Sequence, residues 1–84
     1  FYIACENGNH EIVEMLLADE KVDVNMANVN GTTPFFMACQ NGHFEVVKAI
    51  IRAHFYRPID LSRFRKTGAS PFYIACLRGH TQIV

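Results

Sequence analysis

The middle of the chain reads Gly31-Thr-Thr-Pro-Phe-Phe-Met-Ala-Cys-Gln-Asn-Gly-His-Phe-Glu-Val-Val-Lys-Ala-Ile-Ile51. Thr33 followed by Pro34 predicts a helix start, because the hydroxyl can accept from an unpaired amide and proline suits the first helical position. Gly42 predicts the end of this helix, since glycine readily adopts the left-handed cap conformation. A single apolar stripe at helical spacing then predicts a second helix, formed by Val46, Val47, Ile50 and Ile51. The segment therefore predicts a hairpin of two short helices.

The same pattern occurs three times in the 84 residues. The aligned copies read Phe1-Tyr-Ile-Ala-Cys-Glu-Asn-Gly8, Phe35-Phe-Met-Ala-Cys-Gln-Asn-Gly42 and Phe72-Tyr-Ile-Ala-Cys-Leu-Arg-Gly79. Isolated helices this short are marginal in water, so stability has to come from stacking one unit on the next. We therefore divide the chain into repeat one (1–27), which lacks its opening loop, repeat two (28–64), which is complete, and repeat three (65–84), which stops early in its second helix.

Repeat two resembles the ankyrin repeat in Gly31, Thr33-Pro34, Ala38 and Gly42-His43, and in the aliphatic pairs of its second helix. The resemblance covers essentially the whole chain. It implies a mainly α ankyrin-repeat solenoid of stacked helix-turn-helix units joined by short β-hairpin-like loops. It also implies that His43 and its counterpart His80 lock neighbouring loops together.

Several residues depart from the ankyrin pattern. An aromatic ring replaces the histidine of the first helix at Tyr2, Phe36 and Tyr73. The resemblance therefore implies the loss of the hydrogen bonds that this histidine makes between neighbouring loops. Asn9 stands where repeat two has His43.

Charge limits the class of partner. Eight Lys and Arg balance eight Asp and Glu, which argues against a general nucleic-acid-binding role. The charges are segregated, because residues 1–34 carry six acidic side chains against Lys21 alone, whereas residues 35–84 are mainly basic. No apolar run reaches the roughly 18 residues of a membrane helix, so we expect no membrane partner.

Cys5, Cys39 and Cys76 recur with the repeat, which indicates small buried packing residues. Stacked helices lie about 10 Å apart, too far for a disulfide between repeats. No nucleophile–base–orienter set or phosphate-binding glycine loop is visible. We therefore expect no enzyme activity, no metal, no cofactor and no small-molecule substrate. Unpaired thiols favour a reducing compartment, so we expect an intracellular, cytoplasmic location, with the nucleus as an alternative.

The resemblance implies recognition of another protein, as a scaffold or adaptor without catalytic activity of its own. The alternative is a structural spacer or regulatory domain within a larger multidomain protein, including one that is an enzyme. In the ankyrin family the ligand usually meets the loop tips and the inner faces of the first helices. The matching positions are Glu6 and Asn7 in repeat one, Val29, Asn30, Thr32, Gln40 and Asn41 in repeat two, and Lys66, Thr67, Ala69, Leu77 and Arg78 in repeat three.

Repeat two carries an insertion, because Arg52-Ala-His-Phe-Tyr-Arg-Pro58 puts seven residues where Ala18-Asp-Glu-Lys21 puts four. Long loops on rigid scaffolds often carry function, and Arg and aromatic residues are enriched at interface hot spots. The segment 52–66 is therefore predicted to bind an acidic partner, through basic residues that include Arg52, Arg57, Arg63 and Arg65. A solvated loop of variable length is the simpler interpretation, and binding of nucleic-acid phosphates is a further alternative.

Asn25 is a candidate modification site. Leu17 lies eight residues before it and Asp23-Val24 immediately precede it, which resembles the motif that asparaginyl hydroxylases modify in ankyrin repeats. The simpler interpretation is that the Asn25 side chain bonds backbone groups of its own loop, as asparagine commonly does.

Overall fold

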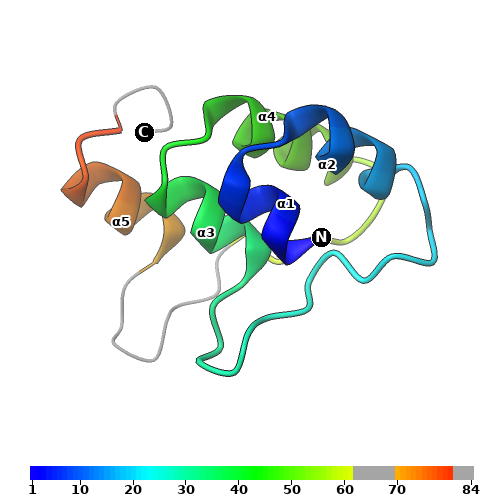
Figure 1. Cartoon of the computed structure of the whole chain (residues 1–84), viewed down its shortest axis with the longest axis horizontal. Helices are drawn as coiled ribbons and strands as arrows, with labels where there is room; N and C mark the ends of the chain where they lie inside the picture. The colour runs from blue at the N-terminus through cyan, green and yellow to red at the C-terminus, as the bar shows by residue number, and fades with distance from the viewer. Residues whose placement is uncertain (62–69, 81–84) are drawn as a thin grey trace.

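The computed structural model describes residues 1–61 and 70–80 (Figure 1). The predicted contacts Arg63, Arg65, Lys66, Thr67 and Ala69, and the side chain of Leu77, lie outside the described part. The helices in the described ranges are α1 (Tyr2–Asn7), α2 (His10–Leu17), α3 (Pro34–Gln40), α4 (Phe44–Ala53) and α5 (Pro71–Leu77).

The helices form two layers (Figure 1). The first helices α1, α3 and α5 pack side by side in one layer, while α2 and α4 pack against each other in the second. The loop between α2 and α3 projects away from both layers (Figure 1). The mainly α architecture of stacked helical hairpins is therefore confirmed.

The loop between repeats one and two has a hairpin-like turn without a β-ladder. Asn28 and Thr32 are joined by a backbone hydrogen bond of 3.0 Å, and the Gly31 amide donates to the Asn28 carbonyl at 2.9 Å. Across residues 1–61 and 70–80 no strand forms, so within these ranges the expected β-hairpin character appears only as this turn.

The predicted helix boundaries follow from local chemistry. Thr33 Oγ1 accepts from the Phe36 amide at 3.1 Å, and Pro34 takes the first helical position of α3. In α5, Ser70 Oγ accepts from the Tyr73 amide at 3.1 Å. Gly42 ends the first helix of repeat two with φ of 71°, a left-handed conformation that favours glycine.

The core lies between the two layers. Its largest fully buried side chains come from repeat two and include Phe35, Phe36 and Ile50. The Phe35 ring meets the Phe72 ring of repeat three edge to face, with centroids 5.9 Å apart. Cys5 and Cys39 are buried and unpaired, as the repeat pattern predicted. Within the described residues, none of the helices is long and apolar enough to cross a bilayer.

Candidate functional site

Histidine side chains fix the spacing between successive repeats. His43 Nε2 donates to the Glu6 carbonyl of α1 at 2.8 Å, and His80 Nε2 donates to the Gln40 carbonyl of α3 at 2.9 Å. The His43 ring lies against Gly8, where an added Cβ would come within 2.6 Å of its Nδ1. These histidines therefore join successive repeats, but they bind the end of the preceding first helix and not a neighbouring loop, which corrects the expected loop-to-loop contact.

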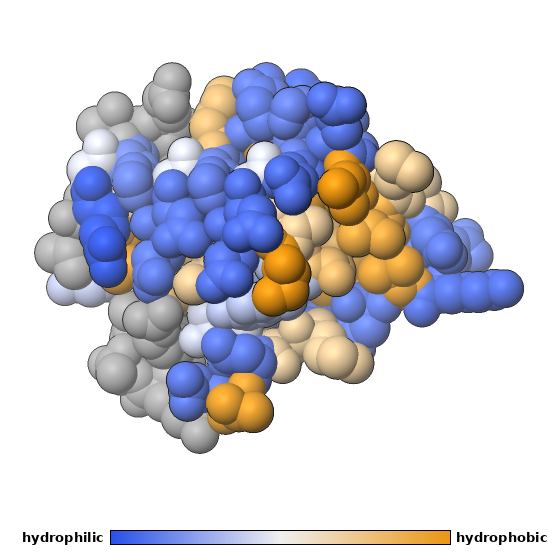
Figure 2. Space-filling model, viewed as in Figure 1, coloured by the Kyte–Doolittle hydropathy of each residue, from blue (hydrophilic) through white to orange (hydrophobic). Residues whose placement is uncertain are grey.

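This lock brings the predicted contact residues of successive first helices together. Asn41 Nδ2 also donates to the Glu6 carbonyl, at 3.1 Å, so the ends of α1 and α3 are adjacent. Asn7, Asn41 and Arg78 are exposed, while Glu6 and Gln40 are half-buried. Figure 2 shows hydrophilic side chains gathered over these first helices. These positions form one continuous surface.

The loop tip at residues 28–32 is held by the Asn28 side chain. Its Oδ1 accepts from the amides of Asn30 and Thr32, at 2.9 and 3.0 Å. Val29, at the outside of this turn, keeps 94% of its surface exposed. Thr32 keeps only 2%, so its prediction as a partner contact is wrong. The turn folds Thr32 back under Asn28 and places it against the core.

The aromatic residue at position 2 restores a contact between repeats. Asn28 Nδ2 donates to Tyr2 Oη at 3.1 Å, which joins α1 to the next loop. The expectation that replacing histidine removes such a bond is therefore wrong at Tyr2. The phenolic oxygen reaches the neighbouring loop and supplies the acceptor.

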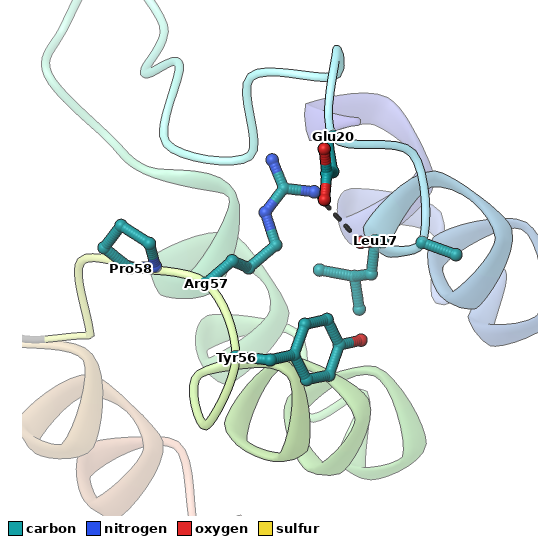
Figure 3. A pocket seen from close by; sticks show the side chains of 6 residues that line it. Leu17, Glu20, Tyr56, Arg57 and Pro58 are labelled. Carbon is teal, nitrogen blue, oxygen red and sulfur yellow. Dashed lines mark hydrogen bonds between the residues drawn. The ribbon is translucent and has the colours of Figure 1, made fainter.

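The insertion contains an arginine that is committed to the protein's own backbone. Arg57 Nη1 donates to the carbonyls of Leu17 and Asp19, at 2.9 and 3.1 Å, and Nη2 donates to the Val22 carbonyl at 2.7 Å. Figure 3 shows the guanidinium extended toward the end of α2. The predicted role of Arg57 as a free contact for an acidic partner is therefore wrong, because both of its Nη atoms already donate to backbone carbonyls of the chain itself. Arg52 remains exposed.

Asn25 makes the reciprocal connection. Its Nδ2 donates to the Pro58 carbonyl at 3.2 Å, and its Oδ1 accepts from the Asp60 amide at 2.8 Å. Asn25 and Arg57 thus join the loops after α2 and α4 from both sides, and we call this pair the clasp. The clasp accounts for asparagine at this position without modification. Hydroxylation of Asn25 stays a prediction, which peptide mass spectrometry of the native protein tests.

The described cysteines are shielded by burial. Burial raises the pKa of both the Cys5 and the Cys39 thiols to about 12, so neither is a good nucleophile at neutral pH. Across 1–61 and 70–80, no three His, Cys, Asp or Glu side chains gather as a metal site would require. The one ion pair found there joins Lys48 to Glu45 at 3.6 Å on the surface of α4.

Comparison with known proteins agrees with this architecture. A search for similar proteins of curated function finds no match. The family model for ankyrin repeats matches three copies over residues 1–84. Ankyrin repeats are generally protein–protein interaction modules and are typically non-catalytic. Because the match extends over all three repeats seen in the sequence, the chain belongs to the ankyrin-repeat family.

Proposed function

We propose that this chain binds another protein, as a scaffold or adaptor without catalytic activity of its own. The surface that carries this function is the inner surface, formed by the exposed ends of the first helices and the loop tip. Its residues are Glu6, Asn7, Val29, Asn30, Gln40, Asn41 and Arg78. The observation that supports the proposal is that Asn41 and His43 of repeat two bind the end of α1, and that His80 of repeat three binds the end of α3 in the same way.

The inner surface combines a fixed backbone with exposed side chains. The Glu6 carbonyl accepts hydrogen bonds from both Asn41 and His43, which holds α1 and α3 in one register. A surface that is ordered before binding loses less conformational entropy when a partner arrives. Val29 adds an exposed aliphatic side chain on a pinned turn, which suits it to contact an apolar residue of the partner.

Site-specific photocrosslinking tests this proposal. We expect a benzoyl-phenylalanine residue at position 29 or 7 of the full-length protein to crosslink a partner protein in its native host. The same residue at position 11 provides the control, because Glu11 is exposed on α2 in the other layer. With the crosslinked partner, Val29→Asp combined with Asn7→Lys should weaken binding about tenfold or more, and Glu11→Lys should leave it unchanged.

The alternative of a structural spacer or regulatory domain makes a different prediction. Crosslinks from position 11 alone, or from none of these positions, would contradict recognition through the inner surface.

A cytoplasmic location is part of the proposal, because Cys5 and Cys39 remain unpaired thiols. Fluorescence imaging of the tagged full-length protein tests that location.

A further inference from the structure

The insertion of repeat two creates two adjoining hollows in the layer of α2 and α4, away from the inner surface. The larger has a volume of about 530 Å³ and is lined by Leu17, Ala18, Glu20, Tyr56, Arg57 and Pro58 (Figure 3). The smaller, of about 170 Å³, lies between Glu14, Leu17, Ala49, Arg52 and Tyr56. Leu17 and Tyr56 line both, so we treat the two as one site, the outer pocket.

The wall of the outer pocket is fixed although its aromatic ring is exposed. The amides of Tyr56 and Arg57 both donate to the Ala53 carbonyl at 3.1 Å, and the clasp ties Arg57 to the loop after α2. Tyr56 nevertheless keeps 69% of its surface exposed, and Figure 3 shows its ring beside Leu17. An exposed tyrosine on a rigid backbone beside an apolar floor is typical of an interface anchor.

The surroundings of the outer pocket favour a cationic partner. Glu14 and Glu20 line it, and α2 and the following loop carry three further exposed carboxylates, Glu11, Asp19 and Asp23, against one exposed cation, Lys21. None of these five carboxylates forms an ion pair with another described residue. The Arg57 charge faces the Leu17 carbonyl at the negative end of α2 and the Asp19 and Val22 carbonyls of the following loop, which offsets part of its positive field. Arg52 is the remaining cation in the lining.

We propose that the outer pocket binds a basic peptide segment of a partner protein. One apolar or aromatic side chain of the peptide packs between Leu17 and Tyr56, and flanking Lys or Arg residues face Glu14 and Glu20. The outer pocket is a second interface, separate from the inner surface, and it shares with the proposed function only that the partner is a protein. The acidic partner predicted for the whole segment 52–66 is the competing outcome.

Selection from a random peptide display library on the full chain tests the proposal. We expect the enriched peptides to carry one apolar residue flanked by Lys or Arg. In fluorescence anisotropy with an enriched peptide, Tyr56→Ala should weaken binding about tenfold or more. Glu14→Lys combined with Glu20→Lys should slow association about tenfold at low salt and reduce its salt dependence.

Matched variants distinguish the loss of a peptide contact from a change in the fold of the chain. Phe55 is exposed but does not line the outer pocket, so Phe55→Ala should leave binding unchanged. Glu11→Lys reverses a carboxylate of α2 outside the lining and should have a smaller effect than the pair at Glu14 and Glu20. All these positions are exposed, so thermal denaturation should be nearly unchanged. In the unmodified chain, amide chemical shifts should move at residues 17–20 and at Tyr56 and Arg57.

Four results would overturn the proposal. These are enrichment of acidic peptides, no enrichment at all, chemical-shift changes confined to the inner surface, and a dimer of this chain that Tyr56→Ala dissociates. Peptides that respond to Val29→Asp and Asn7→Lys but not to Tyr56→Ala would leave the inner surface as the only interface. Failure of the outer pocket is therefore distinguishable from failure of the proposed function.

Discussion

Repeats one and two carry the same apolar pattern but bury it differently. In α2, Ile12 keeps 48% of its surface exposed and Met15 keeps 73%. Their counterparts in α4 are Val46, with no exposed surface, and Ala49, with 5%. Helix α2 packs on α4, whereas no helix in the described residues covers the far side of α2. The pattern thus marks the faces that can pack, and the neighbouring repeat determines which of them become core.

The largest difference in stability loss is expected between alanine variants at matching positions of α2 and α4. Ile50→Ala should lower the free energy of unfolding by about 2–5 kcal/mol, because it leaves a cavity in a fully buried site. Leu16→Ala, at the matching position of α2, should cost about 1 kcal/mol, because Leu16 is only half-buried. Urea denaturation of both variants measures this. Equal losses would contradict the idea that burial depends on the preceding repeat.

Local features of the fold were predictable from the sequence, because each depends on a few neighbouring residues. Thr33 caps α3, Gly42 ends it, and the spacing of Val46 and Ile50 places one face of α4 in the core. The apolar stripe also predicted burial of Ile51, but this side chain remains partly exposed. Burial at the edge of a stripe depends on a neighbouring repeat that periodicity does not describe.

The candidate sites were only partly predictable, because their residues act over long distances in the sequence. The three acceptors of Arg57 lie 35 to 40 positions earlier in the chain, so nothing in the insertion itself indicates the clasp. Thr32 occupies a variable position of the repeat, yet the Asn28 side chain pulls it inward. The hydrogen bond from Asn28 to the Tyr2 hydroxyl could not be predicted either, because the repeat pattern expects histidine at position 2.

The clasp gives the second comparison, between two arginines of the same insertion. Arg57→Leu should lower the free energy of unfolding by about 1.5–3 kcal/mol, because three carbonyls lose a charged donor. Arg52→Leu should change it by less than about 0.5 kcal/mol, because Arg52 is exposed. Arg57→Lys should recover part of the loss, since an ammonium keeps the charge without the guanidinium fork.

Thermal or urea denaturation measures the stabilities of these arginine variants, and hydrogen exchange locates the effect. In Arg57→Leu, the amides of residues 18–22 should exchange faster, because the loop after α2 loses its tether. A fall in stability without faster exchange in that loop would assign Arg57 a role other than the clasp.

A smaller difference in stability loss is expected between alanine variants at the residues that precede α2 and α4. His43→Ala should cost about 1–2 kcal/mol, because the ring both donates to the Glu6 carbonyl and covers Gly8. Asn9 occupies the matching position of repeat one, where it is exposed and its side chain makes no cap hydrogen bond. Asn9→Ala should therefore change stability by less than about 0.5 kcal/mol. A comparable cost at both positions would show that the residue acts mainly on its own helix.

The rate of thiol labelling should be the same for the buried cysteines of repeats one and two. Cys5 and Cys39 are both fully buried, and their helices α1 and α3 each pack on the second helix of their own repeat as well as on each other. Thiol labelling of the folded protein, followed by peptide mapping to separate Cys76, should modify both equally slowly. Fast labelling of Cys5 alone would mean that the open side of repeat one extends into its first helix.

The same thiols give the stability a defined pH dependence. Burial raises the pKa of each from 9.0 to about 12, so the thiols ionise first in the unfolded chain. Their contribution is complete below about pH 9 and is lost as the pH rises from there toward 12. Other groups also titrate in this range, so the urea midpoint should fall less steeply in a Cys5→Ala, Cys39→Ala double variant. If the two slopes coincide, the folded chain admits water to these thiols, and the tight packing of α1 against α3 does not hold in solution.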